Sequence, residues 1–268
     1  MDKITILGTG NAAVTRCFNT CFILHSNDTS LLVDAGGGNG ILRQLELAGI
    51  PLNDISAMYI THCHTDHLLG AVWILRFIAT AFVQGKRSGS FTFYGPQKVL
   101  DALDTICRLT LPEKVTSRIG NEIIMRPVSD DETFSIGDIG MTAFDIGSTK
   151  ELQFGFRAIL PSGTSLVCLG DEPFNERCRK YAVGADWLMH EAFCLYAQRD
   201  IFKPYEKHHS TSLEAGKVAQ DLGVKNLILY HTEDRNLATR RATYTAEAAT
   251  HFTGAIHVPD DLDTIPLS

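Results

Sequence analysis

Short apolar runs separated by turn residues fill the first part of the chain. Runs of four to eight apolar residues bounded by Gly, Asn, Asp and Ser are typical of buried strands. The stretch LLGAVWILRFIATAF exceeds ordinary strand length and therefore predicts a buried helix. Strands are predicted at 3–8, 20–25, 30–36, 55–62 and 90–96, and helices at 41–49, 68–82 and 99–110.

The pattern continues to the end of the chain without a low-complexity linker. Thr211 and Glu214 have the spacing of a capping box, and Gly223 closes the helix that they begin. Strands are predicted at 122–128, 141–147, 154–160, 164–171, 186–192 and 227–231, and helices at 174–183 and 211–223. Two similar halves that share one core predict a single domain over residues 1–268. We expect an α/β (α+β) fold, a four-layer αββα sandwich with outer helices on two sheets.

The composition mainly excludes classes of function and location. The 268 residues are 44% hydrophobic and 21% charged, and the net charge of -7 argues against non-specific nucleic-acid binding through a basic surface. The N-terminal stretch MDKITILGTG has no signal-peptide pattern, and no membrane span is expected, so we predict a cytoplasmic protein. The seven cysteines are odd in number and form no C-x-x-C pair, which predicts free thiols.

One motif, ILGTGNAA, matches the G-x-G-x-x-A outline of a dinucleotide site, and Asp34 ends a later strand. That site needs a helix directly after Gly10. The turn cluster SNDTS lies instead between two short apolar runs and predicts a β-hairpin. We therefore disfavour dinucleotide binding.

The stretch THCHTDHLLG, residues 61–70, places three histidines and an aspartate within six positions. In extended chain, alternate side chains point the same way, so His62 and His64 can bind one centre while Cys63 faces away. Asp66 and His67, after the strand end, can turn toward a second centre. The spacing predicts two metal ions.

Later strand ends offer further candidate ligands, and strand ends are where α/β scaffolds collect their sites. Asp171 follows VCLG, His190 and Glu191 end WLMHE, and His231 ends LILYH. Compact histidine and carboxylate clusters are costly to bury unless they bind something.

Together these stretches resemble the metallo-β-lactamase superfamily and, within it, the ribonuclease Z-like phosphodiesterase branch. LGTGNA, LLVDAG, THCHTDHLLG, the YGP turn, GFR, GDEP, HEAF, HHST and LILYH occur in the expected order over nearly the whole chain. The H-x-H-x-D-H motif is specific to the superfamily, and HST with a preceding Glu-Ala pair indicates the phosphodiesterase branch.

The resemblance implies a metallo-β-lactamase fold, two divalent metals, zinc with manganese or iron as alternatives, and a set of roles. Two metals can hold a hydroxide nucleophile between them, which Asp66 would orient. His209 would protonate the leaving group, with Glu191 holding its imidazole; His208 is the weaker candidate. By this resemblance one metal is held by His62, His64 and Asp171, and the other by Asp66, His67, Asp171 and His231.

Two departures from the family pattern bear on the site and the substrate. Gly147 stands where relatives carry a third histidine for the first metal, which would weaken that site; Asp145 is a possible substitute ligand. Only 24 positions separate Gly147 from Asp171, too few for a tRNA-gripping arm. The basic and aromatic segment before His209, with Lys203, Tyr205 and Lys207, could hold a phosphate and a base.

We therefore expect a hydrolase acting on a small phosphodiester or nucleotide, with no membrane partner and a homodimeric state. The alternatives are a ribonuclease Z-like tRNA 3′-processing endonuclease, a hydrolase of another ester, and a catalytically decayed metal- or nucleotide-binding module. Retention of Asp66, Glu191 and His209 argues against a pure binder.

Overall fold

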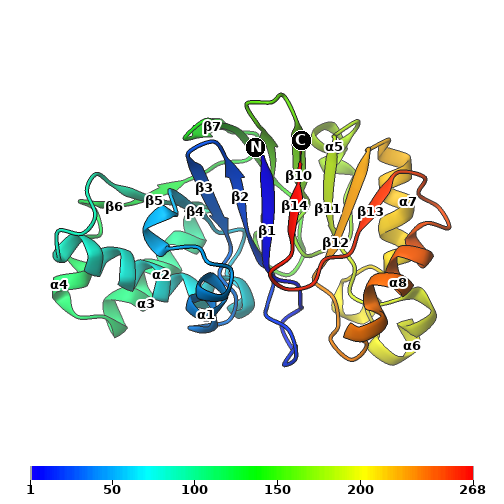
Figure 1. Ribbon diagram of the computed structural model, residues 1–268, viewed down its shortest axis with the longest axis horizontal. Coiled ribbons are helices and arrows are strands. Elements are labelled where there is room, and N and C mark those ends of the chain that lie inside the picture. Colours follow the sequence, from blue (N-terminus) through cyan, green and yellow to red (C-terminus); the bar gives the residue numbers. More distant parts are fainter. Residues whose placement is uncertain (1, 268) are drawn as a thin grey trace.

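The computed structural model describes residues 2–267 and places two seven-stranded sheets face to face with helices on the outside (Figure 1). The first sheet has the order β14-β1-β2-β3-β4-β5-β6 and the second β13-β12-β11-β10-β9-β8-β7. The first is made of β1 (Lys3–Gly8), β2 (Cys21–Ser26), β3 (Thr29–Val33), β4 (Ala57–Tyr59), β5 (Phe91–Gly95), β6 (Ile123–Pro127) and β14 (Thr264–Pro266). The second is made of β7 (Thr133–Ile136), β8 (Ile139–Asp145), β9 (Phe154–Ile159), β10 (Ser165–Cys168), β11 (Trp187–Glu191), β12 (Asn226–Tyr230) and β13 (Ala255–His257).

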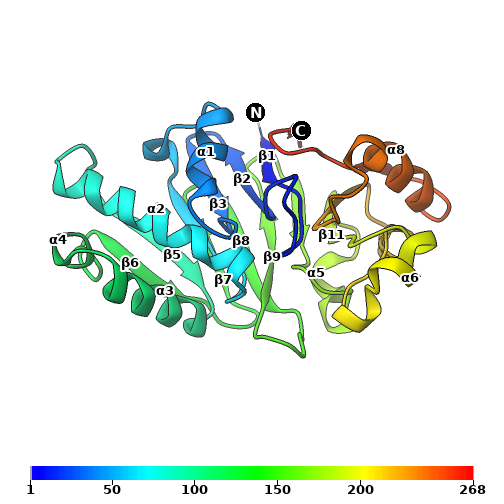
Figure 2. The same ribbon diagram turned by 90° about the horizontal axis from the view of Figure 1, so that it is seen from below.

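The helices form the two outer layers, and Figure 2 shows α1, α2 and α3 along one side of the molecule. The helices are α1 (Gly40–Leu47), α2 (Thr65–Val83), α3 (Gln97–Thr110), α4 (Glu113–Thr116), α5 (Arg179–Ala182), α6 (Arg199–Phe202), α7 (Ser212–Leu222) and α8 (Leu237–Ala248). Short 3₁₀ turns occur at Leu52–Asp54, Glu176–Cys178, Tyr196–Gln198 and Tyr205–Lys207.

Three apolar clusters follow from this layering. The central cluster joins the inner faces of both sheets, with Ile4 and Leu24 of the first meeting Phe156 and Met189 of the second. A second cluster lies between the first sheet and α1 to α3, and a third between the second sheet and α5, α7 and α8. The predicted four-layer sandwich is confirmed.

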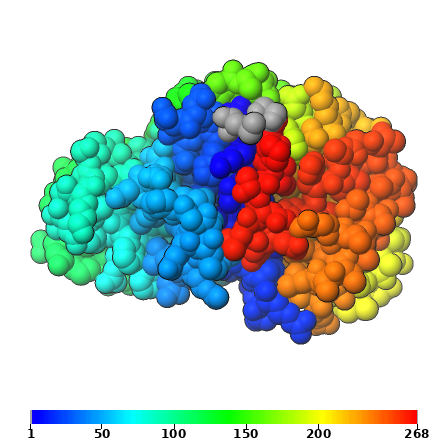
Figure 3. Space-filling model, in the orientation of Figure 1, coloured from blue at the N-terminus to red at the C-terminus, as the bar shows by residue number. Residues whose placement is uncertain are grey.

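Apart from β14, the chain divides between the sheets in sequence order, β1 to β6 in the first and β7 to β13 in the second. The strand predicted at 122–128 is β6, the edge of the first sheet. The C-terminal strand β14 returns to pair with β1, Ile4 opposite Ile265, and Figure 3 shows this C-terminal segment lying across the seam between the halves. Both terminal strands of the described chain therefore lie in the first sheet.

Several elements were not predicted. The helix α8 buries only Arg240, Tyr244 and Ala248, which is too polar a face to produce a strong helical pattern. The helix predicted at 174–183 is shorter, because the Asn175 side chain accepts a hydrogen bond from the backbone N–H of Arg177 and a 3₁₀ turn precedes α5. The capping box of α7 and the left-handed Gly223 that ends it are confirmed.

The G-x-G-x-x-A stretch is not a dinucleotide site. An irregular loop, not a helix, follows Gly10, and β2 and β3 form the predicted hairpin with Phe22 opposite Val33.

Among the described residues, one helix, α2, is long and apolar enough to cross a membrane. Half of its apolar window is buried, and Ala71, Ile74 and Ile78 lie in the cluster beneath the first sheet. Core helices pass the same length and composition test, and the buried helix predicted here is confirmed as a core element.

Candidate metal centre and active site

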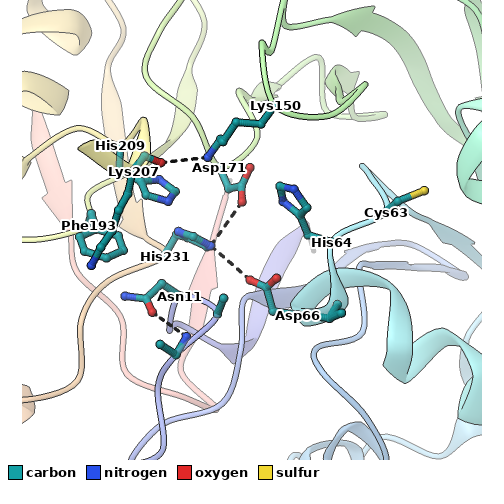
Figure 4. Close-up of a pocket in the computed structure, with 13 residues that line it drawn as sticks. Asn11, Cys63, His64, Asp66, Lys150, Asp171, Phe193, Lys207, His209 and His231 are labelled. Carbon is teal, nitrogen blue, oxygen red and sulfur yellow. Dashed lines mark hydrogen bonds and ion pairs between the residues drawn. The ribbon is translucent and has the colours of Figure 1, made fainter. Parts of the chain in front are cut away.

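The H-x-H-x-D-H motif spans the loop after β4 and the first turn of α2. His64 is the N-cap of α2, and the helix begins at Thr65, three residues before the predicted start, so that Asp66 and His67 lie within its first turn. The Nε2 atom of His62 lies 2.9 Å from Nδ1 of His64, so the two rings share one side as predicted. Cys63 belongs to neither ligand cluster described below, and its sulfur points away from the centre (Figure 4).

Two strand ends of the second sheet complete the centre. Asp171 follows β10, and His231 follows β12 in a left-handed conformation with φ of 58°. The Oδ2 atom of Asp171 lies 3.5 Å from Nε2 of His62, 3.4 Å from Nε2 of His67 and 3.5 Å from Nε2 of His231. The carboxylate of Asp171 therefore stands among the imidazoles of both halves.

Two candidate ligand clusters share Asp171, the grouping that the resemblance implied, and a third group joins Glu191, His209 and His231. We call His62, His64 and Asp171 the first cluster. The second cluster consists of Asp66, His67, Asp171 and His231, and all four residues are buried.

The chemistry of these groups fits a divalent cation. The buried atoms Nε2 of His67, Oδ1 of Asp171 and Nε2 of His231 have no hydrogen-bond partner. Leaving such groups unpaired in a protein interior is costly, whereas imidazole and carboxylate donors together suit zinc, manganese or iron.

The charges within the centre are strongly coupled. Burial alone would raise the pKa of Asp66, but the nearby imidazoles of His67 and His231 lower it below its usual range. Burial would lower the pKa of His67, but Asp34 and Asp66 raise it well above the ordinary value. Burial lowers the pKa of His62 well below its ordinary value. In the metal-free protein these shifts favour the charged, doubly protonated imidazole of His67 and the neutral, singly protonated imidazole of His62.

Asp34 lies outside the two ligand clusters and orients their histidines through hydrogen bonds, a role that the sequence analysis missed. Its Oδ2 atom lies 2.7 Å from Nδ1 of His67 and accepts a 2.8 Å hydrogen bond from Oγ1 of Thr61. Oγ1 of Thr61 lies 2.9 Å from Nδ1 of His62. Both rings are thereby turned so that Nε2 faces the centre, as outer carboxylates commonly do for metal-binding histidines.

Close packing of α2 against residues 34–36 brings His67 to Asp34. A Cβ atom at Gly70 would lie 1.9 Å from the backbone oxygen of Ala35, so only glycine lets α2 pack this tightly. The Gly70 N–H donates a 2.9 Å hydrogen bond to the backbone oxygen of Gly36.

His209 and Glu191 lie beside the second cluster. Nδ1 of His209 is 3.6 Å from Oε2 of the fully buried Glu191, and its ring stacks on Phe193 with centroids 4.7 Å apart. The left-handed His208 is exposed and belongs to neither cluster. The structure thus brings His209, not its neighbour, to the pocket.

Gly147 is not oriented as the sequence analysis supposed. It has φ of +75°, and a Cβ atom there would meet Arg177 Cδ at 2.7 Å and Asn175 Nδ2 at 2.8 Å rather than any ligand. Asp145 pairs with Arg177 at 3.2 Å and is in neither cluster. The expectation that Gly147 occupies a ligand position is therefore wrong, although the first cluster still lacks a third imidazole.

Two lysines from separate loops line the pocket (Figure 4). The Lys150 ammonium donates to the backbone oxygen of Lys207 at 3.1 Å, and the Lys207 ammonium lies 4.8 Å from the Phe193 ring centroid. Lys203 and Tyr205 do not line it; they contact Glu206 and Glu214 instead. Lys150 was missed because only the fold brings its loop to the site.

Comparison with known proteins agrees with this geometry. The chain is 27% identical to ribonuclease Z of Methanothermobacter thermautotrophicus, over 99% of this chain and 96% of the relative. The metallo-β-lactamase fold protein YhfI from Bacillus subtilis is similar with a TM-score of 0.77 and 20% identity, covering 98% of each chain. The human short-form tRNase Z is similar with a TM-score of 0.76 and 23% identity, covering 99% of each chain.

Fold and site together define a protein of the metallo-β-lactamase superfamily that is similar to ribonuclease Z, which confirms the resemblance seen in the sequence. A family profile described as anti-Pycsar protein Apyc1 matches residues 2–249. The chain belongs to that family.

Proposed function

We propose that this protein is a metal-dependent hydrolase of small phosphodiesters, with a nucleotide as substrate. One observation carries the proposal: two ligand clusters share Asp171 in a pocket that is also lined by His209, and His209 pairs with the buried Glu191. The relatives named ribonuclease Z and tRNase Z are consistent with this chemistry.

The clusters would hold two divalent ions, zinc in the first instance, with manganese or iron as alternatives. When bound, such ions supply Lewis acidity and an activated water. Asp66 presents a carboxylate oxygen 3.3 Å from His67 and 3.6 Å from His231, and would accept a hydrogen bond from the attacking water and so orient it.

His209 would deliver the proton that the leaving oxygen needs. Glu191 lies at ion-pair distance from Nδ1 of the ring and accepts a hydrogen bond from the Ser210 N–H, which fixes the carboxylate. Stacking on Phe193 holds the ring plane, and Nε2 is left for the substrate. Glu191 thus acts by positioning His209.

The pocket suits a small anionic substrate. Its volume of about 490 Å³ lies within the usual range for small-molecule sites. Lys150 and Lys207 line the pocket from two loops; Lys150 pairs with Glu172 at 3.5 Å, whereas no side-chain carboxylate pairs with Lys207 among the described residues. A phosphate group at the clusters would lie beside these ammonium groups.

Cleavage of tRNA is the second candidate, supported by the names of the relatives. The connection from Gly147 to Asp171 holds only β9, β10 and the turn between them, so a long arm is absent there. Together with the net charge of -7, this favours the smaller substrate. Homodimer formation and a cytoplasmic location remain predictions.

A substrate panel tests the proposal. Purified protein loaded with zinc, manganese or iron should hydrolyse 3′,5′-cyclic nucleotides or bis(p-nitrophenyl) phosphate faster than p-nitrophenyl phosphate, a lactam, a thioester or a tRNA precursor. Preferential cleavage of the tRNA precursor would establish the second candidate. Preference for a lactam or thioester would reject the phosphodiesterase assignment.

His209→Ala separates a catalyst from a binding module. Turnover should fall by about 10² to 10⁴, the usual contribution of a general acid, while metal content stays the same. The loss should shrink for p-nitrophenyl leaving groups, which need no proton. Equal cleavage of a cyclic nucleotide by the variant would show that His209 has another role.

A further inference from the structure

A second cavity, of about 290 Å³, shares His209 with the metal-ligand pocket. Its walls are largely apolar or aromatic, with Phe174, Tyr205 and Val218 among the lining residues. Its polar lining includes His190 and Glu214, neither of which belongs to the two ligand clusters. We call it the His190 cavity.

His190 presents a hydrogen-bond acceptor in this cavity. The side chain is 1% exposed, and its Nδ1 atom lies 2.6 Å from the backbone oxygen of Glu191. A carbonyl oxygen only accepts, so Nδ1 carries the hydrogen and Nε2 of the neutral ring carries a lone pair. That buried Nε2 atom has no hydrogen-bond partner.

Apart from His209, which faces both cavities, the other polar groups have their hydrogens engaged and leave acceptor lone pairs. The Glu214 carboxylate accepts 2.8 Å hydrogen bonds from Thr211 and from the Tyr205 hydroxyl, and keeps further lone pairs. The Ser210 hydroxyl already donates to the backbone oxygen of Glu191. A lining of acceptors and a carboxylate disfavours an anion and favours a ligand with N–H donors.

We propose that the His190 cavity binds the nucleobase of a nucleotide substrate and selects a base with an exocyclic amino group, donated to Nε2 of His190. A planar ring matches the aromatic and apolar walls, and His209 would stand between the base and the phosphate, in reach of the leaving oxygen. This inference rests on the proposed function, because it places the phosphate in the neighbouring pocket.

Adenosine and inosine 3′,5′-cyclic phosphates form a matched pair, since they differ by an amino and an oxo group at one ring carbon. The adenosine compound should have a kcat/KM about tenfold higher, as expected for one hydrogen bond gained against one acceptor left unpaired. Val218→Trp should fill the cavity from α7, and His190→Phe should remove the acceptor. Either substitution should reduce the ratio to about one.

Lys217→Trp, at the neighbouring exposed position of α7, is the control and should leave the ratio unchanged. Turnover of bis(p-nitrophenyl) phosphate, which has no base, reports separately on the hydrolytic site. A wild-type ratio near one, or a ratio that Val218→Trp does not alter, would overturn the inference while the proposed function stands.

If no phosphodiester is hydrolysed, the proposed function fails and calorimetric binding of free adenosine and inosine decides the inference. Binding of adenosine that exceeds that of inosine and is lost in Val218→Trp supports the His190 cavity as a base site. Absence of adenosine binding to the unmodified protein rejects it.

Discussion

The two ligand clusters are built from the same residue types but have unequal surroundings. The second cluster has four ligands, all buried, and Asp34 contacts His67 directly. The first has three, its His64 is partly exposed, and Asp34 reaches His62 only through Thr61. The comparison teaches that neighbouring histidines of one motif need not make equal sites, because ligand number, burial and outer hydrogen bonds differ. We expect tighter metal binding at the second cluster.

Removing the shared carboxylate should have the largest effect. Asp171→Ala deprives both clusters of a ligand, so hydrolysis should fall by about 10³-fold or more, the equivalent of several kcal/mol of transition-state stabilisation. His64→Ala should lower metal content at the first cluster alone. Elemental analysis of both variants would decide, and equal metal loss in the two would contradict the inequality of the clusters.

Substitutions of the residues that hydrogen-bond to the histidine ligands should change the metal affinity of one cluster more than that of the other. Asparagine tolerates the φ of 55° at position 34, but Asp34→Asn weakens the hydrogen bond to His67. The zinc affinity of the second cluster should therefore fall by about 10- to 100-fold. Thr61→Val removes the hydroxyl behind His62 and should weaken the first cluster instead. Calorimetric zinc titration of both variants checks this, and identical losses at both clusters would refute it.

The sequence predicted the metal ligands better than the residues that orient them. His62, His64, Asp66 and His67 share one motif, and Asp171 and His231 end apolar strands, so spacing and strand ends suffice to find them. Asp34 could be found only once Gly70 had brought α2 against residues 34–36. The pattern around DAG carried no signal for that contact.

Orientation was the other limit of sequence reasoning. Counting back from Gly155 placed Gly147 at the metals, but the backbone there turns through a left-handed conformation toward Arg177. Lys150 enters the pocket for the same reason, since its loop is positioned by pairing of β8 with β9. Strands β7 and β13 and the polar helix α8 were missed because short or polar elements have weak periodicity.

Proton release should also distinguish the clusters. Metal binding at the second cluster must displace the Nε2 proton of His67, whose charged form Asp34 and Asp66 stabilise, whereas the buried His62 is already neutral. Second-cluster zinc affinity should therefore rise with pH up to the folded pKa of His67. Calorimetry in buffers of different ionisation enthalpy should count about one proton released per zinc from His67. Binding without proton release at neutral pH would contradict this assignment.

The same linkage governs the stability of the metal-free protein. The pKa of His67 is raised above its unfolded value of about 6.5. Its stabilising contribution is thus complete below about pH 6.5 and is lost as pH rises through the folded pKa. Melting curves of metal-free protein should show this loss on the alkaline side, and His67→Gln should abolish that dependence.

The smallest expected effect is that of Gly147→His. The new side chain would meet Arg177 and Asn175 at a position with φ of +75°, so stability should fall by roughly 1–3 kcal/mol without any gain in zinc affinity. Gly163→His is the matched control, with φ of +86° but nothing within 4 Å of a Cβ atom, and should be less destabilised. Increased zinc affinity in Gly147→His would show that position 147 reaches the first cluster after all.

Stepwise removal of metal with simultaneous measurement of metal content and phosphodiester turnover tests the central claim most directly. The purified protein should carry a transition metal, lose one ion readily from the first cluster, retain about one per chain at the second, and recover activity when zinc, manganese or iron is restored. Protein that contains no transition metal and hydrolyses phosphodiesters at an unchanged rate after exhaustive chelation would contradict the account.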